Sequence, residues 1–300
     1  MIINIKLYIH FFIVPYSKER TAMTQLQGIP ESLLIPLAAR SYETEKAHAI
    51  IKDPISQRIM AKLDYDFDKF SASWITQVGI SVRTWLIDQL VRRFIEQAKQ
   101  PLIINIGCGL DTRRQRLNLE DIPWIDLDVP DVILLRKQFF QETELNRFIA
   151  KSLLDETWMD DVRTWPPYTE NSDILIIIEG VMMYFEHSEV QQFFNFVSQK
   201  LNAHQLQMIV ECCSQLMAEH THYHPTVSRL DSRPRFKYGY NRLSDFVKIL
   251  PRTLRVTSEH SLFDYHSRRW KWFGLCRWIP FLKKRMNNKI VIIEQRESGI

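Results

Sequence analysis

A chain of 300 residues, 45% of them hydrophobic, is long enough to bury a sizeable core, so length and composition predict a globular protein. The 39 basic and 35 acidic residues leave a net charge of only +4, which gives no argument for a nucleic-acid or membrane partner. The four cysteines form neither a metal-binding C-x-x-C pair nor a dense disulfide framework. We therefore expect a cytoplasmic protein with no nucleic-acid or membrane partner.

The N-terminal segment is apolar but does not match a targeting sequence. Lys6 and His10 interrupt Met1–Tyr16, and no small-residue cleavage site follows. The segment is also too short to span a bilayer. A signal or anchor stays open as the alternative, but we expect residues 1–23 to be an extension, with Met23 as a candidate biological start.

The rest of the chain falls into a helical part and an alternating part. Apolar residues recur at spacings of three and four between residues 30 and 100, which predicts a helical N-terminal cap over residues 24–100. Beyond it, short apolar runs alternate with amphipathic segments, as in a doubly wound α/β domain, here residues 101–300. A polar stretch at about 214–244, after the fifth strand, is expected to be an inserted lid. The predicted strands are Leu102–Ile106, Trp124–Asp128, Phe148–Leu153, Asp173–Ile178, Gln205–Glu211, Leu254–Phe263 and Lys289–Gln295.

A glycine-rich turn follows the first predicted strand. Open α/β sheets bind ligands at the carboxyl ends of their strands, and glycine lets a nucleotide approach the backbone closely. Gly107, Gly109 and Asp111 form this turn, but Thr112 occupies the position of the third glycine in the dinucleotide fingerprint. The turn therefore predicts a nucleotide-like cofactor and argues mildly against a nicotinamide.

The second predicted strand ends in two carboxylates, Asp126 and Asp128. A carboxylate at this edge of the sheet can accept both hydroxyl protons of a ribose. We favour Asp128 for that contact over Asp126. The alternative is that Asp128 only caps a helix that starts near Pro130.

Several motifs together resemble the leucine carboxyl methyltransferase family, and its bacterial polyketide O-methyltransferase branch is most similar. The resemblance runs from about residue 30 to residue 295. Its most specific block is Gly-Leu-Asp-Thr-Arg at residues 109–113. The other matching stretches are Ala39–Glu43, Asp53–Pro54, Arg83–Thr84, Asp126–Val132, Glu179–Phe185 and Phe236–Gly239.

This resemblance implies a class I S-adenosylmethionine-dependent methyltransferase fold, with a mostly parallel seven-stranded sheet whose last strand is antiparallel. It implies that Gly107 contacts the methionine portion of the cofactor and that Asp128 binds the ribose. Arg83 would pair with the cofactor carboxylate, since a guanidinium matches a carboxylate with two parallel hydrogen bonds. The stretch Leu153, Leu154 and Asp155 would surround the adenine, although Leu153 departs from the acidic residue often found there.

Four further residues are assigned to catalysis or to the substrate. Glu179 follows the most apolar strand and could face the cofactor's cation, or it could simply be an acid at a helix N-terminus. Glu179, Tyr184 or a histidine would be the base if the acceptor is a hydroxyl, whereas a carboxylate acceptor needs none. Arg40 and Lys237 are assigned to an acidic substrate. The expected activity is O-methylation of a carboxylate or acidic hydroxyl of a small, polyketide-like molecule.

Two other clusters suggest alternatives. His220, His222 and His224 alternate and could ligate zinc from one side of a strand, but substrate contact or solvation is preferred and no metal is expected. The segment Ser267–Met286 mixes basic and aromatic residues. It could bind RNA or an anionic membrane, or it could be a sheet-packing helix with a solvated basic face, which we prefer. A non-enzymatic nucleotide- or RNA-binding module is thus the main alternative, with an oxidoreductase as a further one.

Overall fold

The computed structural model describes residues 29–296. The predicted extension at residues 1–23 and the candidate start at Met23 lie outside the described residues. Within residues 29–296, no helix is long and apolar enough to cross a membrane.

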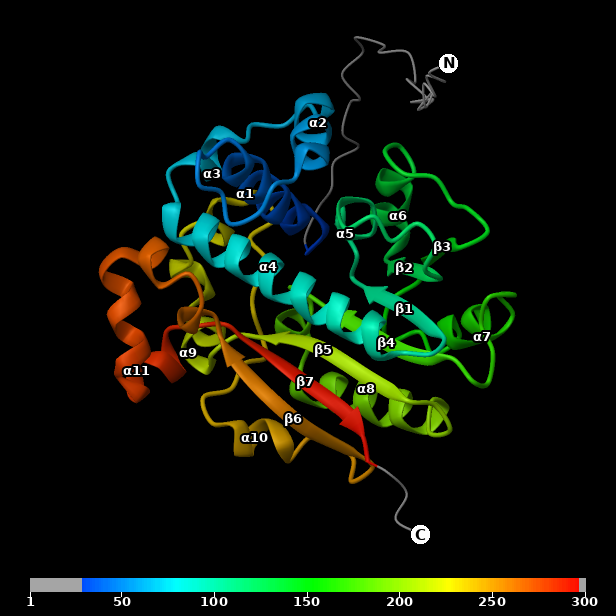
Figure 1. Ribbon diagram of the computed structural model, residues 1–300. Helices are drawn as coiled ribbons and strands as arrows, with labels where there is room; N and C mark the ends of the chain where they lie inside the picture. The colour runs from blue at the N-terminus through cyan, green and yellow to red at the C-terminus, as the bar shows by residue number, and fades with distance from the viewer. Residues whose placement is uncertain (1–28, 297–300) are drawn as a thin grey trace, which may run out of the picture.

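A seven-stranded sheet with the order β3-β2-β1-β4-β5-β7-β6 forms the centre of the molecule (Figure 1). Strands β1 to β5 are parallel to one another, and β7 is antiparallel to both β5 and β6. The predicted fold class is confirmed. The strands are β1 (Pro101–Ile106), β2 (Trp124–Asp128), β3 (Asn146–Ala150), β4 (Asp173–Ile178), β5 (Leu206–Cys212), β6 (Leu254–Ser261) and β7 (Lys289–Gln295).

Successive residues of β4 pack on opposite faces of the sheet, and both faces are covered, which explains why this strand is apolar along its length. Ile174, Ile176 and Ile178 pack with the core on the side of α7 (Trp158–Arg163), α8 (His187–Lys200) and α10 (Leu243–Val247). Leu175 and Ile177 pack with the core on the side of α4 (Trp74–Gln97), the long helix that crosses the opposite face in Figure 1. A strand covered on both faces has no polar side.

The helical cap is built from η1 (Ile29–Leu33), α1 (Leu34–Thr44), α2 (Pro54–Lys62) and α3 (Asp68–Ser71). Its apolar side chains share a core with the glycine turn and with Tyr184 and Phe236. Helix α4, predicted as part of the cap, packs against α1 and also on the sheet. The remaining short helices are α5 (Arg113–Arg116), α6 (Pro130–Arg136), η2 (Met182–Tyr184), η5 (Leu262–Asp264), η6 (Ser267–Trp278) and α11 (Pro280–Arg285).

The segment between β5 and β6 lies over the end of the sheet. It contains α9 (Gln215–Glu219), η3 (Thr221–Tyr223), η4 (Val227–Arg229) and α10. The carbonyl of Met183, in η2, accepts backbone N–H bonds from Lys237 (2.7 Å) and Tyr238 (3.2 Å). These bonds hold the insertion against the chain that follows β4.

One buried arginine fixes the elements around the glycine turn. Arg113 is fully buried and donates to Asp88 of α4 (2.9 Å), to Asp111 of the turn (2.5 Å) and to Glu179 after β4 (2.7 Å). Arg116 also pairs with Asp88. The guanidinium thus ties a helix, a turn and a strand end to one point.

We predict that Arg113→Met lowers the free energy of unfolding by about 3–5 kcal/mol, because removing one partner leaves buried carboxylates uncompensated. Urea denaturation at pH 7 measures the change. The matched control is Arg92→Met, at an exposed position of α4, for which we expect a change below ~0.5 kcal/mol. Equal stability of the Arg113 variant and the parent would contradict this role.

Candidate active site

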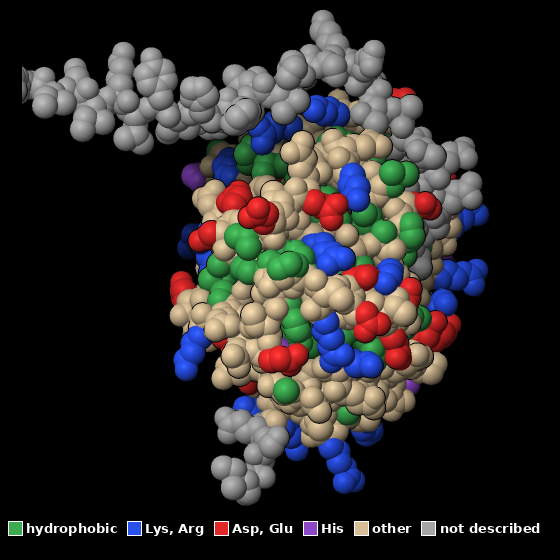
Figure 2. All heavy atoms as spheres, turned by 90° about the vertical axis from the view of Figure 1, so that its right-hand side faces the viewer, with side chains coloured by type: hydrophobic (Ala, Val, Ile, Leu, Met, Phe, Trp, Pro, Cys, Tyr) green, Lys and Arg blue, Asp and Glu red, His purple; other side chains and the backbone are tan. Residues whose placement is uncertain are grey.

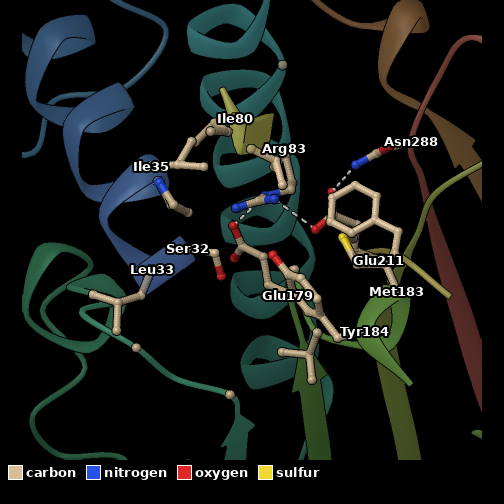
Figure 3. Close-up of a pocket in the computed structure, with 18 of the residues that line it drawn as sticks. Ser32, Leu33, Ile35, Ile80, Arg83, Glu179, Met183, Tyr184, Glu211 and Asn288 are labelled. Carbon is tan, nitrogen blue, oxygen red and sulfur yellow. Dashed lines mark hydrogen bonds and ion pairs between the residues drawn. The ribbon is translucent and has the colours of Figure 1, made fainter. Parts of the chain in front are cut away.

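A cavity of about 830 Å³ opens at the carboxyl ends of β1, β2, β4 and β5. It lies where the strand order reverses between β1 and β4, the position at which open α/β sheets bind ligands. One part is bounded by the glycine turn, and the other by the cap and the insertion. Figure 3 shows part of the cavity lining, with side chains from η1, α1, α4 and the ends of β4 and β5.

The glycine turn needs its glycines. Gly107 and Gly109 have φ angles of +66° and +47°, in the left-handed region. A Cβ on Gly107 would lie 2.2 Å from Cγ2 of Val181, so no side chain fits there. Arg136 donates from Nη1 to the carbonyls of Gly109 (3.0 Å) and Asp111 (2.9 Å). The turn is therefore a fixed backbone cradle at the floor of the cavity.

The two carboxylates of β2 have different surroundings. Asp126 is fully buried and pairs with Arg136 at 2.8 Å, so it is held within the protein. Asp128 lines the cavity and accepts N–H bonds from Gly109 and Val129, both at 2.8 Å. It makes no side-chain cap on α6, whose N-cap is Val129. Burial raises the pKa of Asp128 to about 6, although the two N–H bonds lower it.

Only part of the predicted adenine stretch lines the cavity. Strand β3 ends at Ala150 rather than at Leu153, so the turn begins earlier than predicted. Lys151, Ser152 and Leu153 line the cavity, whereas Leu154 and Asp155 do not. Asp155 is exposed and accepts two bonds from Thr157.

Arg83 lies between two protein carboxylates. Its Nε donates to Glu179 at 2.7 Å and its Nη1 donates to Glu211 at 2.8 Å (Figure 3). Burial alone would raise the pKa of Glu179, but Arg83 and Arg113 outweigh burial and hold that pKa at about 2. A carboxylate this acidic is a poor base, so Glu179 supplies negative charge rather than proton acceptance.

Glu211 and Asn288 are two cavity residues that sequence reasoning missed. Glu211 is fully buried and also accepts from Asn288 at 2.6 Å. A signal for Glu211 was present, since an acid ending an otherwise apolar strand lies at the same edge as the glycine turn. Asn288 carried no comparable signal.

The structure does not give Arg40 and Lys237 the free charges expected of substrate contacts. Arg40 is buried at the cavity wall and donates to Asp53 (2.9 Å) and to the carbonyl of Leu110 (2.8 Å). It therefore ties α1 to the turn. Lys237 is exposed, does not line the cavity and pairs with Glu186 at 3.3 Å.

The part of the cavity under the insertion is mostly apolar. Tyr184 is buried there, edge-to-face with Phe236 at 5.3 Å between ring centroids. Burial raises the pKa of Tyr184 to about 12, which disfavours it as a base at neutral pH. The apolar side chains of this chamber include Ile35, Ile80, Met183, Phe185, Val227 and Phe236.

The three histidines do not lie on a strand. They fall at the end of α9 and around η3, and among the described residues no group of three or more His, Cys, Asp or Glu could hold a metal. His220 and His224 line the cavity, but His222 does not. Nδ1 of His220 donates to the carbonyl of Leu216 (3.1 Å), and Nδ1 of His224 accepts from the Val227 N–H (3.2 Å). The two rings therefore present different tautomers.

Comparisons with known proteins agree with this site. The chain is 28% identical over 178 residues to the tetracenomycin polyketide synthesis O-methyltransferase TcmP of Streptomyces glaucescens, covering 59% of this chain and 64% of that protein. It is 29% identical over 180 residues to the S-adenosyl-L-methionine-dependent methyltransferase dpfgK of Gibberella zeae, covering 55% of this chain and 59% of that protein. Both matches thus span less than two thirds of these relatives.

Solved structures share the fold at low sequence identity. A Thermobifida fusca protein, provisionally described as a methyltransferase, has a TM-score of 0.54 at 13% identity, covering 86% of this chain and 94% of that one. A DUF574 family protein of Streptomyces avermitilis has a TM-score of 0.54 at 11% identity, covering 87% and 97%.

The fold and the site define the class of S-adenosylmethionine-dependent methyltransferases. The leucine carboxyl methyltransferase family model matches residues 34–198, more than half of the chain, and the chain belongs to this family. The described residues fit the cofactor. The backbone of Gly107 and Gly109 lines the cavity, and Asp128 has lone pairs beyond those that its two N–H donors use.

We predict that Asp128→Ala weakens S-adenosylmethionine binding by roughly 2–4 kcal/mol, the contribution of a pair of hydrogen bonds to a charged group. Calorimetric titration measures the affinity. Asp131→Ala, at an exposed position of α6, is the control and should bind like the parent. Unchanged affinity in a folded Asp128 variant would remove this residue from the site.

The raised pKa of Asp128 gives the same prediction a pH dependence. Only the ionised carboxylate accepts both ribose hydroxyls well, so affinity should fall as the pH drops through about 6. In the ligand-free protein the raised pKa of Asp128 lowers the free energy of unfolding. This loss begins above the ordinary pKa of an aspartate, is fully present above pH about 6, and is absent below the ordinary pKa. Asp128→Asn should therefore stabilise the fold at pH 7.5 but not near pH 3.5.

Proposed function

We propose that this protein transfers the methyl group of S-adenosylmethionine to an oxygen of a small, largely apolar molecule. The observation that carries the proposal is the continuity of the cavity. It joins the glycine cradle and Asp128 to an apolar chamber within a single space of about 830 Å³. Methyl transfer in line requires donor and acceptor to meet in such a shared, enclosed space.

The cofactor would be held by the cradle at Gly107 and Gly109 and by Asp128, and it would supply an electrophilic methyl group on a sulfonium. Leu153 is the proposed adenine contact. The protein's own task is to position the acceptor, exclude water and provide charge. Glu179 suits the last task, because its low pKa keeps it anionic beside the cradle across the neutral range.

A hydroxyl suits the chamber better than a carboxylate as the acceptor. The two buried arginines of the lining are already neutralised, Arg40 by Asp53 and Arg83 by Glu179 and Glu211, whereas Arg285 lines the cavity from an exposed position. An anionic acceptor in the buried part of the chamber would therefore lack a cation to compensate its desolvation. His220 lines the cavity and supports hydroxyl chemistry, since a positioned histidine is the commonest general base for such an acceptor. His220 is thus the proposed base, in place of Glu179 or Tyr184.

The oxidoreductase alternative is weaker on the same evidence. Thr112, which replaces the third fingerprint glycine, is fully buried and donates to Asp53 at 2.7 Å. The side chain at the start of α5 therefore fills this position and is committed to a contact with the cap. A dinucleotide pyrophosphate needs this position open for its close approach.

Calorimetric titration with S-adenosylmethionine, S-adenosylhomocysteine and nicotinamide dinucleotides tests the cofactor. We expect the first two to bind, because the cradle and Asp128 would recognise the amino-acid and ribose portions that both share. Mass spectrometry after incubation with panels of apolar phenols and carboxylic acids tests the acceptor. Binding of the dinucleotides alone would end the methyltransferase proposal.

We predict that His220→Gln lowers kcat towards hydroxyl acceptors by ~10²-fold or more, the usual contribution of a general base. The rate with a carboxylate acceptor, which needs no base, should hardly change. His222→Gln is the matched control, since His222 is near in sequence but outside the cavity lining. An equal loss with both acceptor types would show that His220 shapes the chamber rather than accepting a proton.

A further inference from the structure

The C-terminal segment Ser267–Met286, which includes η6 and α11, differs from the predicted sheet-packing helix. Three residues of η6 are buried, and Trp270 among them packs edge-to-face on Phe263 at 4.9 Å. No residue of α11 is buried. The segment thus has a small anchor in the core, and most of it lies on the surface beside α9, at the left of Figure 1.

Large apolar side chains of this segment face solvent. Trp278 is 71% exposed, Trp272 66%, Leu275 65% and Phe281 61%, and Ile279 and Met286 are also exposed. Six of the nine large hydrophobic residues that are exposed among residues 29–296 belong to these twenty residues. Such a concentration marks an interaction surface rather than ordinary scatter.

The same segment carries a concentration of positive charge. It holds seven of the 39 basic residues and none of the 35 acidic ones, so the other 280 residues have a net charge of −3. Within the described part of the chain, only Arg269 and Lys283 of these seven pair with a carboxylate. Arg277 and Arg285 lie over exposed aromatic rings, those of Trp278 and Phe281, at 4.7 and 4.5 Å.

We propose that the segment Ser267–Met286 docks the protein on an anionic lipid surface. Tryptophan and phenylalanine insert at the level of the headgroups, while lysine and arginine bind the lipid phosphates above them. The exposed aliphatic residues Leu275, Ile279 and Met286 favour lipid over RNA, which would be bound by stacking and phosphate contacts alone. A second copy of the chain would bring like charges together.

The face of the molecule opposite α11 differs from the proposed docking surface. Figure 2 shows the side of the molecule turned away from α11, where acidic and basic side chains are intermingled. The docking surface also borders the cavity, since Arg285 and Met286 belong to both. The proposal does not depend on methyl transfer, because it concerns binding only.

Cosedimentation of the full chain with vesicles tests the proposal. We expect the protein to bind vesicles of phosphatidylglycerol and phosphatidylcholine at least tenfold more tightly than pure phosphatidylcholine vesicles. Trp272→Ser with Trp278→Ser should weaken binding tenfold or more, and Leu134→Ser, at a 63% exposed site of α6, should not.

Loss of three charges in Arg268→Gln, Arg277→Gln and Lys284→Gln should weaken binding at low salt. The same loss in Lys62→Gln, Lys99→Gln and Lys200→Gln, at exposed sites elsewhere, should have little effect.

Three results would overturn the proposal. One is no binding of the folded protein to anionic vesicles, and another is equal weakening by both charge variants. The third is evidence that something else binds this surface. An RNA oligonucleotide that binds more tightly and displaces the vesicles would show this, and so would a dimer that becomes a monomer when both tryptophans are replaced. Circular dichroism of each variant confirms that it is folded.

Discussion

The arrangement of the site depends on one buried guanidinium, that of Arg113, and on the three carboxylates that it contacts. Asp88 belongs to a helix on the sheet, Asp111 to the glycine turn, and Glu179 to the end of β4. Each carboxylate would resist burial alone, and together they are stable because the arginine compensates them. The positions of turn, helix and strand end are thus set by charge as well as by apolar packing.

Two of the carboxylates that line the cavity, Glu179 and Asp128, show how surroundings set the pKa of a side chain. Glu179 is held between Arg83 and Arg113, so its pKa is low. Asp128 has only backbone N–H partners, so burial prevails and its pKa rises to about 6. One carboxylate is therefore a permanent charge, and the other is ready to form hydrogen bonds to a neutral polyol. Similar side chains at the ends of β2 and β4, on either side of β1, thus suit separate tasks.

Much of the fold could be predicted from the sequence, because strands covered on both faces are continuous apolar runs and the glycine turn has a local signature. Both ends of six of the seven strands were predicted to within two residues. The exception is β3, which was predicted to end at Leu153 but ends at Ala150, so that Leu153 belongs to the following turn. Ion pairs could not be predicted. Arg83 meets Glu211 across 128 positions of sequence, and no local pattern encodes such a partner.

The assignments of Arg40 and Lys237 show the same limit. A sequence shows that a residue is charged, but its availability to a ligand depends on neighbours from distant elements. Asp53 neutralises Arg40, whereas the backbone directs Lys237 towards solvent. The segment Ser267–Met286 differs from its predicted structure for another reason. The spacing of its aromatic residues resembles that of a core-facing helix, but only Trp270 among its tryptophans is buried.

The contacts of Asp53 have a consequence for dynamics. This side chain accepts from Arg40 of α1, from the N-terminus of α2 and from Thr112 beside the turn, so the cap and the cradle share one polar centre. Any ligand that orders the cradle must also favour the docked state of the cap, by thermodynamic linkage. Local opening of α1 and α2 would then be rarer in the ligand-bound protein. Exchange of their amide hydrogens should slow when the cradle is filled, although no cap residue needs to touch the ligand.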